Sequence, residues 1–404
     1  MAASLLLSAL LFHQLAPTSV GVYAFSSATH PLPHPLPHPH PQPQPPCTPT
    51  FRSGKSHDYF RLFDAVPSLY QEQERLLVER GRVESELMKD TGSPIAASVS
   101  KGTGAAKGFA ASSSSSSSNL KAAAKIHSKE LRKSGVVRID DVLTGDMAEQ
   151  LRDYVFELRE RAEEQVGSGQ VRSIARFADV LLKENRCDLT IPLEDDEDDD
   201  NADDVVIDAL LHVLQKTPVG KMMSSMLGKQ AGLYELSCLI SDKGSNRQVV
   251  HPDTPCKPDE DAVLYTCFIA LQDIDPTMGP TTWLPNTHTM EAHEIFKDDY
   301  VGPSYSSSSS STAGESSKDK LLRTTPSVLG LLPRGSCAIF DSRLLHCGGA
   351  NTSDTSRALF YFSFKNSGIG YPGNPGSIRP ELASKFTITS LEQELKQLKK
   401  KKRR

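Results

Sequence analysis

The spacing of hydrophobic and polar positions changes near the middle of the chain. Before Gly232, several segments place apolar residues three or four positions apart, which is the period of an amphipathic helix. After Gly232, the apolar runs are short, rich in β-branched and aromatic residues, and separated by glycine, proline, asparagine and aspartate, as strands are. The pattern therefore predicts helices in the first part of the folded region and a sheet in the second.

The helical segments carry residues that suit helix starts. Pro67 and Pro218 fit a first helical position, and Thr144 suits the position before one. Gly81 lies within the first segment and is predicted to interrupt it. The expected helices span residues 67–90, 147–166, 205–214, 218–227 and 391–404.

The apolar runs after Gly232 predict an antiparallel barrel or jelly roll, because many short strands with turn residues between them are typical of that architecture. The helical segments come first, so we expect them to brace one face of the barrel. The predicted fold class is therefore mainly β with bracing helices, a double-stranded β-helix of the jelly-roll or cupin-like kind. The expected strands span residues 135–139, 233–240, 263–271, 282–284, 328–332, 337–340 and 357–364.

Composition separates one folded domain from low-complexity segments within the 404 residues. Proline, serine, alanine with glycine, or acidic residues dominate several stretches that are unsuited to forming a core. The predicted organisation is a Pro/Ser-rich region at 25–127 that contains the first helix, a catalytic domain at 128–385 with an acidic loop at 194–204 and a Ser-rich insert at 303–319, and a basic helical tail at 386–404.

Residues 1–24 have the pattern of a targeting peptide: an apolar run is followed by small residues that suit cleavage. Phe25 directly after Ala24 resembles the bipartite plastid-targeting presequences of diatoms and related algae. Both an endomembrane or secretory route and a plastid therefore stay open. A buried N-terminal helix is the alternative, since the segment lacks an early Lys or Arg.

Charge and cysteine content narrow the function classes. The net charge of −5 is mild, and no aromatic residues are interleaved with basic ones, so no nucleic-acid partner is expected. Seven scattered cysteines without a CxxC pair indicate neither a disulfide framework nor a zinc site. The basic tip at 399–404 is either solvated or in peripheral contact with an anionic membrane. Oligomeric state is left open.

Three residues with metal-binding side chains carry the candidate chemistry. His251 and Asp253 are two positions apart after an apolar run, and a strand would point both to one face. His346 follows another expected strand, which a barrel can bring opposite the first pair. Two histidines and one carboxylate form the facial triad that holds non-haem Fe(II). We call His251, Asp253 and His346 the metal triad.

Arg357 opens the last expected strand, and its charge would be costly in a barrel interior unless an anion pairs with it. A small dicarboxylate bound to the metal would supply that anion, and the guanidinium could hold it through two hydrogen bonds. Thr266 and Phe268 share one face of the expected strand 263–271, so we expect both near such a ligand.

These segments resemble, in order, the phytanoyl-CoA dioxygenase family of Fe(II)- and 2-oxoglutarate-dependent oxygenases. The resemblance covers about residues 130–366. The chain departs from it at Asn286, where the family often has Gly, and at Phe268, where it often has Trp. The matching segments are Gln248-x-x-His251-x-Asp253, Ile269–Asp273, Met278-Gly279-Pro280, Trp283–His288, His346 and Arg357.

The resemblance implies that the metal triad binds Fe(II), that Arg357 binds the far carboxylate of 2-oxoglutarate, and that O2 takes a remaining metal position, with ascorbate as an additional reductant. It also implies hydroxylation of an unactivated C–H bond in a small or lipid-like molecule, coupled to decarboxylation of 2-oxoglutarate to succinate and CO2. Related halogenases have a small residue in place of the carboxylate, so Asp253 favours hydroxylation.

Two other functions compete with this interpretation. One is a protein side-chain hydroxylase, although prolyl hydroxylases usually place Lys rather than Arg on the cosubstrate. The other is a non-catalytic metal-binding barrel that acts as an interaction protein. Taken singly, His251 could be a core histidine, Asp253 a turn cap and Arg357 a surface residue, so the hypothesis depends on their joint order and spacing.

Overall fold

The computed structural model describes residues 67–88, 93–96, 117–193, 202–258, 261–297, 316–369 and 376–402. The predicted targeting peptide lies outside these residues, as do most of the Pro/Ser-rich region, the acidic loop and the Ser-rich insert.

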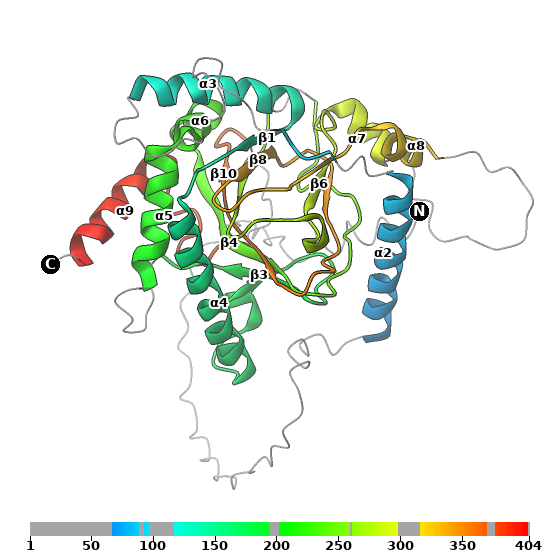
Figure 1. The fold of residues 1–404 in the computed structure, drawn as a ribbon, viewed down its shortest axis with the longest axis horizontal. Helices are drawn as coiled ribbons and strands as arrows, with labels where there is room; N and C mark the ends of the chain where they lie inside the picture. Colours follow the sequence, from blue (N-terminus) through cyan, green and yellow to red (C-terminus); the bar gives the residue numbers. More distant parts are fainter. Residues whose placement is uncertain are drawn as a thin grey trace, which may run out of the picture. The chain divides into compact units, whose positions relative to one another are not determined.

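A seven-stranded antiparallel sheet forms the centre of the described part (Figure 1). Its strand order is β1, β8, β5, β10, β4, β3, β2, so neighbouring strands come from distant parts of the sequence. In that order the strands span Val136–Ile139, Cys337–Asp341, Leu264–Ala270, Arg357–Lys365, Gly232–Ser241, Arg186–Thr190 and Phe177–Ala178.

A three-stranded antiparallel sheet packs against the inner face of the large one. The ring centroids of Trp283 in the small sheet and Phe340 in the large sheet are 5.9 Å apart, and both residues belong to one hydrophobic cluster. Two antiparallel sheets packed in this way form a jelly roll. The predicted fold class is therefore confirmed. The small sheet has the order β7 (Val328–Leu329), β6 (Thr281–Trp283), β9 (His346–Gly348).

Side chains alternate between the two faces of the large sheet, as strand geometry requires. In β5, Cys267 and Ile269 point outward to a large cluster shared with helices, whereas Phe268 and Ala270 point inward. Strand β10 repeats this alternation, with Phe360 pointing outward. The inward face is the one that can carry a site.

Five helices cover the outward face and share its hydrophobic cluster. Thr144 caps α4 by accepting a hydrogen bond from Met147 N, and Thr217 caps α6, whose first residue is Pro218. Figure 1 shows α4, α5 and α9 together on one side of the strands. The five helices are α3 (Ser117–Ser134), α4 (Gly145–Gly167), α5 (Ala202–Lys216), α6 (Pro218–Leu227) and α9 (Ile388–Lys402).

The remaining helices include α2 (Pro67–Leu87), α7 (Met290–Lys297) and α8 (Ser317–Thr324), which lie on another side of the strands (Figure 1). An ion pair of 2.7 Å between Arg80 and Asp319 joins α2 to α8. Two short 3-10 helices, η1 (Ser173–Ala175) and η2 (Pro276–Met278), complete the described helices.

Several predicted boundaries were wrong. Helix α2 continues through Gly81, so this glycine does not interrupt it. Helix α3 begins at Ser117, inside the Pro/Ser-rich region at 25–127, and the Ser-rich insert ends in α8. The C-terminal helix packs on the outer cluster through the buried Leu391 and Leu395, while Lys400 and Lys401 of its basic tip are exposed. Strands β2, β3 and β9 were not predicted.

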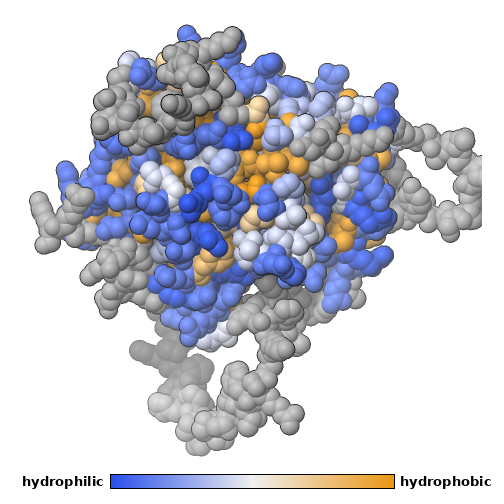
Figure 2. Space-filling model, in the orientation of Figure 1, coloured by the Kyte–Doolittle hydropathy of each residue, from blue (hydrophilic) through white to orange (hydrophobic). Residues whose placement is uncertain are grey.

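The surface of the described part is mainly hydrophilic on the face seen in Figure 2, with hydrophobic side chains grouped between polar ones. Within the described residues, no helix has the length and apolar character needed to cross a membrane.

Candidate metal centre

The metal triad comes together in the structure. The donor atoms of His251, Asp253 and His346 all lie within 4.8 Å of one another, close enough to surround a single ion. Asp253 Oδ1 is 3.9 Å from His251 Nε2 and 3.5 Å from His346 Nε2. Within the described part of the chain, no other group of three His, Cys, Asp or Glu residues is arranged for metal binding.

Backbone pairing holds the two histidines side by side. His251 and His346 form an isolated antiparallel bridge, in which each backbone N donates to the other's carbonyl oxygen at 2.9 Å. The imidazole ring centroids are 4.7 Å apart. His346 also pairs with Trp283 within the small sheet. The site is therefore built on the edge of a sheet rather than on a free loop.

Each histidine has its ring orientation fixed by a backbone carbonyl. His251 Nδ1 lies 2.8 Å from Val249 O, and His346 Nδ1 lies 2.9 Å from Leu344 O. A carbonyl can only accept, so both Nδ1 atoms carry the proton and both Nε2 lone pairs are free. This carbonyl contact is the usual outer-shell arrangement of metal-bound histidines.

The electrostatic environment keeps both imidazoles neutral. Burial, together with the nearby His346, lowers the pKa of His251 to about 4, and burial lowers the pKa of His346 to about 4. A neutral imidazole is the form that binds a metal. At neutral pH the metal-free protein therefore presents two unprotonated nitrogen donors.

The carboxylate of the metal triad lies on the open side of the site. Asp253 keeps 38% of its side chain exposed, compared with 23% for His251 and 7% for His346. The backbone N of Asp253 donates to Ser342 O at 2.8 Å, and that of Thr254 donates to the same oxygen. The turn is therefore fixed while the carboxylate remains accessible to solvent and small molecules.

Arg357 is fully buried at the start of β10, on the inward face. Its guanidinium donates to Gly279 O and, at 3.1 Å, to Ser241 Oγ, while its buried Nε has no hydrogen-bond partner. Burial, and to a lesser extent the nearby Arg186, lowers the pKa of Arg357 to about 9. An uncompensated buried cation with a free donor favours binding of an anion.

A second buried arginine, which the sequence analysis missed, lies beside the first. Arg186 of β3 donates from Nε to the same Ser241 hydroxyl at 3.2 Å, and its other nitrogens contact only backbone carbonyls. Burial lowers the pKa of Arg186 to about 10. No signal in the sequence distinguishes Arg186, because it belongs to a short strand that was not predicted.

The interior around the metal triad is largely aromatic. The Phe340 ring centroid lies 5.1 Å from that of His346 and 5.0 Å from that of Phe268, and Tyr361 lies beyond Phe268 at 5.3 Å. Phe268 is thus connected to His346 through the ring of Phe340. Thr266 lies on the same strand face and donates at 3.5 Å to Glu235, so it contacts an acid rather than the two arginines. Their roles toward a cosubstrate remain predictions.

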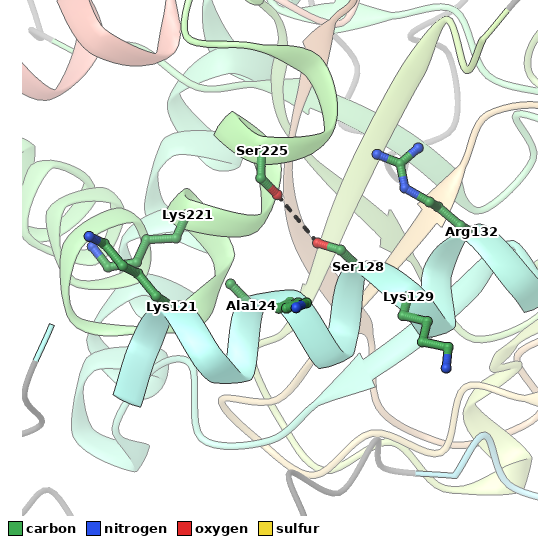
Figure 3. Close-up of a pocket in the computed structure, with 8 residues that line it drawn as sticks. Lys121, Ala124, Ser128, Lys129, Arg132, Lys221 and Ser225 are labelled. Atoms are coloured by element: carbon green, nitrogen blue, oxygen red, sulfur yellow. Dashed lines mark hydrogen bonds between the residues drawn. The ribbon is translucent and has the colours of Figure 1, made fainter. Parts of the chain in front are cut away.

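A basic groove elsewhere on the surface is separate from the metal triad. It has a volume of about 570 Å³ and lies between α3 and α6, with Ser128 and Ser225 in contact at its floor (Figure 3). Its charged lining is entirely basic and consists of Lys121, Lys125, Lys129, Arg132 and Lys221.

Comparison with known proteins gives one family. Residues 131–359 match the model of the family described as Phytanoyl-CoA dioxygenase (PhyH). The matched region contains the complete metal triad, Arg357 and Arg186 and begins after most of α3. No curated protein matches the chain.

Several solved structures are distantly similar. A non-haem alpha ketoglutarate dependent carbocyclase, SnoK from nogalamycin biosynthesis, is 16% identical, with 60% of this chain and 84% of that chain covered and a TM-score of 0.41. AviO1 from Streptomyces viridochromogenes Tue57 is 15% identical, with 61% and 96% covered and a TM-score of 0.41. The non-haem monooxygenase ThoJ, in a nickel complex, is 16% identical, with 68% and 97% covered and a TM-score of 0.40.

Proposed function

The chain belongs to the phytanoyl-CoA dioxygenase family, a family of non-haem iron and 2-oxoglutarate-dependent oxygenases, and we propose that it is such a dioxygenase with a hydroxylase activity. Its reaction would place a hydroxyl group on an unactivated C–H bond of a small or lipid-like molecule. The same turnover would convert 2-oxoglutarate and O2 to succinate and CO2. The observation that carries the proposal is a metal triad whose two imidazoles are both oriented by backbone carbonyls.

The donor set fits Fe(II). Two neutral imidazoles and one carboxylate are the ligands of the facial triad in non-haem iron oxygenases, and they leave other metal positions open. Bound Fe(II) would supply the site at which 2-oxoglutarate and O2 react. The protein's own contribution is to hold the three donors, with the Nδ1 contacts fixing both rings before metal arrives.

The two buried arginines support 2-oxoglutarate as cosubstrate. A cosubstrate chelated to the metal by its keto acid end has a second carboxylate that needs a cationic partner inside the protein. Arg357 offers a buried nitrogen without a partner, and Arg186 adds a second positive charge through the shared Ser241 hydroxyl. Binding of the dicarboxylate would neutralise charge that the metal-free interior holds uncompensated.

The other end of the same strands carries an acid. Glu235 of β4 pairs in register with Ser363 of β10, six residues away from Ser241, which is about 20 Å along a strand. Burial, and then the charge of Asp253, raises the pKa of Glu235 to about 8. This pKa leaves the carboxyl mostly protonated at neutral pH, and together with the aromatic lining it supports a substrate that is neutral and largely apolar.

Succinate formation tests the proposal. We expect the purified full-length chain with Fe(II), ascorbate, 2-oxoglutarate and O2 to form succinate even without its substrate. Such enzymes convert 2-oxoglutarate slowly when no substrate is hydroxylated. Asp253→Ala should abolish succinate formation. The matched control is Asp354→Ala, because this carboxylate has an 89% exposed side chain and pairs only with Lys243. A folded wild-type protein that binds metal and forms no succinate contradicts the proposal.

Oxygen labelling identifies the product. Cell extract is incubated under oxygen-18 gas with wild-type protein or with Asp253→Ala, and metabolites are compared by mass spectrometry. A hydroxylase yields a product that carries one oxygen-18 atom and is absent from the Asp253→Ala sample. A product that has lost hydrogen without gaining labelled oxygen would agree with the proposed cofactors but contradict the proposed hydroxylation.

A further inference from the structure

A buried glutamate from α2 contacts the segment that carries the first metal ligand. Glu84 is completely buried, and its Oε2 accepts a hydrogen bond of 2.6 Å from the backbone N of Val250, the residue before His251. Helix α2 lies outside residues 131–359, which match the family. A part of the chain beyond the family region therefore contributes to the surroundings of the metal triad.

One peptide unit connects Glu84 to His251. The N–H of Val250 and the C=O of Val249 belong to the same planar peptide. Its N–H donates to Glu84, and its carbonyl accepts from His251 Nδ1 at 2.8 Å. A carboxylate that binds the N–H polarises the peptide and strengthens its oxygen as an acceptor. Glu84 thus acts, through one rigid unit, on the contact that orients the His251 ring.

Glu84 is itself held by cations from two helices. Its Oε1 lies 2.9 Å from Arg80 Nε in α2 and 3.3 Å from Lys318 Nζ in α8. Lys318 also lies 4.2 Å above the ring of Phe296. A buried carboxylate persists only when it is paired and hydrogen-bonded, and here both oxygens are satisfied. The position of the carboxylate is therefore well defined.

The rest of the same helix face fits closely on this segment. A Cβ atom added at Gly81 would lie 2.8 Å from Arg247 O, so only glycine allows this approach. Met88, one turn beyond Glu84, shares a hydrophobic cluster with Val250 and Leu345. Residues three and four positions apart lie on one helix face, so Gly81, Glu84 and Met88 form a single contact surface.

We propose that Glu84 is a positioning residue for the metal centre, which it serves by holding the Val249–Val250 peptide and thereby the His251 ring. The inference rests on the metal centre proposed above. Without the carboxylate, the buried N–H of Val250 has no acceptor and its peptide can tilt. The His251 Nε2 then loses its fixed direction toward the ion.

Cobalt binding tests the inference without requiring turnover. Co(II) is titrated into the metal-free full-length protein and followed by its visible absorption. Loss of an outer-shell partner lowers metal affinity by about 10–100-fold, and Glu84→Ala, which leaves the Val249 carbonyl in place but no longer holds its peptide, should lower it by about 10-fold. Glu84→Gln keeps an oxygen acceptor for Val250 N–H but loses the charge. Its Co(II) affinity should therefore lie between those of wild type and Glu84→Ala. Glu86→Gln is the matched control, because Glu86 lies on the same helix with 67% of its side chain exposed.

The ring proton of His251 gives a second measurement that applies even where Glu84→Ala does not fold. In protein labelled with nitrogen-15 at histidine, the His251 resonances, assigned with His251→Ala, report whether Nδ1 carries the proton. Glu84→Gln should shift them and leave those of His293 in place. Wild-type protein that binds no Co(II) overturns the metal centre itself. If wild type binds Co(II), and Glu84→Gln has the same Co(II) affinity and the same His251 resonances as wild type, only the role of Glu84 is overturned.

Discussion

Replacement of Arg357 by methionine should stabilise the metal-free protein while removing its response to 2-oxoglutarate. Burial lowers the pKa of Arg357 well below its ordinary value, to about 9. Each pKa unit corresponds to about 1.4 kcal/mol, so holding this cation in the interior costs about 5 kcal/mol. Because the folded-state pKa lies below the unfolded value, the cost is fully present below about pH 9 and disappears as the pH rises toward the pKa of an exposed arginine.

The substitution also removes two hydrogen bonds, to Gly279 O and Ser241 Oγ. Each contributes roughly 1.5 kcal/mol, so the net effect of Arg357→Met is about 2 kcal/mol of added stability. Methionine keeps a flexible apolar stem of similar length, which limits the loss of packing. The expected gain follows from the absence of any carboxylate paired with Arg357 or Arg186 among the described residues.

Urea unfolding at pH 7.5 measures the effect, with the fluorescence of Trp283, the single tryptophan, as the signal. A ligand at 100 times its Kd stabilises a protein by about 2.7 kcal/mol. With Co(II) present, saturating 2-oxoglutarate should raise the free energy of unfolding of wild type by about 2.7 kcal/mol. It should hardly change that of Arg357→Met. Arg334→Met, a control at an arginine with 42% of its side chain exposed, should change neither quantity. A destabilised Arg357→Met protein that still responds to 2-oxoglutarate would refute the reasoning.

Three further changes test other parts of the site. His346→Ala should lower Co(II) affinity by roughly 100-fold or more in a calorimetric titration, whereas His288→Ala should not. Burial raises the pKa of Glu235 to about 8, so metal-free wild type should lose up to about 1.4 kcal/mol per pH unit between pH 5 and 8, and Glu235→Gln should show a flatter profile in urea unfolding. Gly279→Ala should lower the thermal midpoint more than Gly169→Ala, because both glycines have positive φ but only Gly279 has backbone atoms within 3 Å of an added Cβ.

The metal triad was predictable from the sequence, although its local structure was not. The spacing of His251 and Asp253 suggested two neighbours on one strand face. In the structure, His251 forms a bridge to His346 and Asp253 lies in the bend that follows. The prediction was right about proximity, because the bridge pairs His251 with His346 and the bend leaves Asp253 within reach of both. Pattern reasoning cannot distinguish a strand from a single bridge, because both place alternate residues alike.

Departures from the family pattern also have physical reasons in the structure. Asn286 stands where the family often has glycine, and its φ is 68°. This left-handed conformation suits glycine and, among other residues, asparagine. The sequence alone could not show that the substitution preserves the turn. The packing of Phe268 against Phe340 likewise shows how a smaller ring than tryptophan occupies the interior.

Arg186 and Glu84 show where sequence reasoning ends. Each is a single charged residue in a segment without a motif, and exposure is the ordinary state of such residues. Their importance appears only when the fold brings β3 beside β10 and α2 beside Val250. The two residues also differ in how their charges are paired. Glu84 is paired with Arg80 and Lys318, which fixes its carboxylate. Arg186 has no carboxylate partner in the described part, which is what the proposed anion site requires.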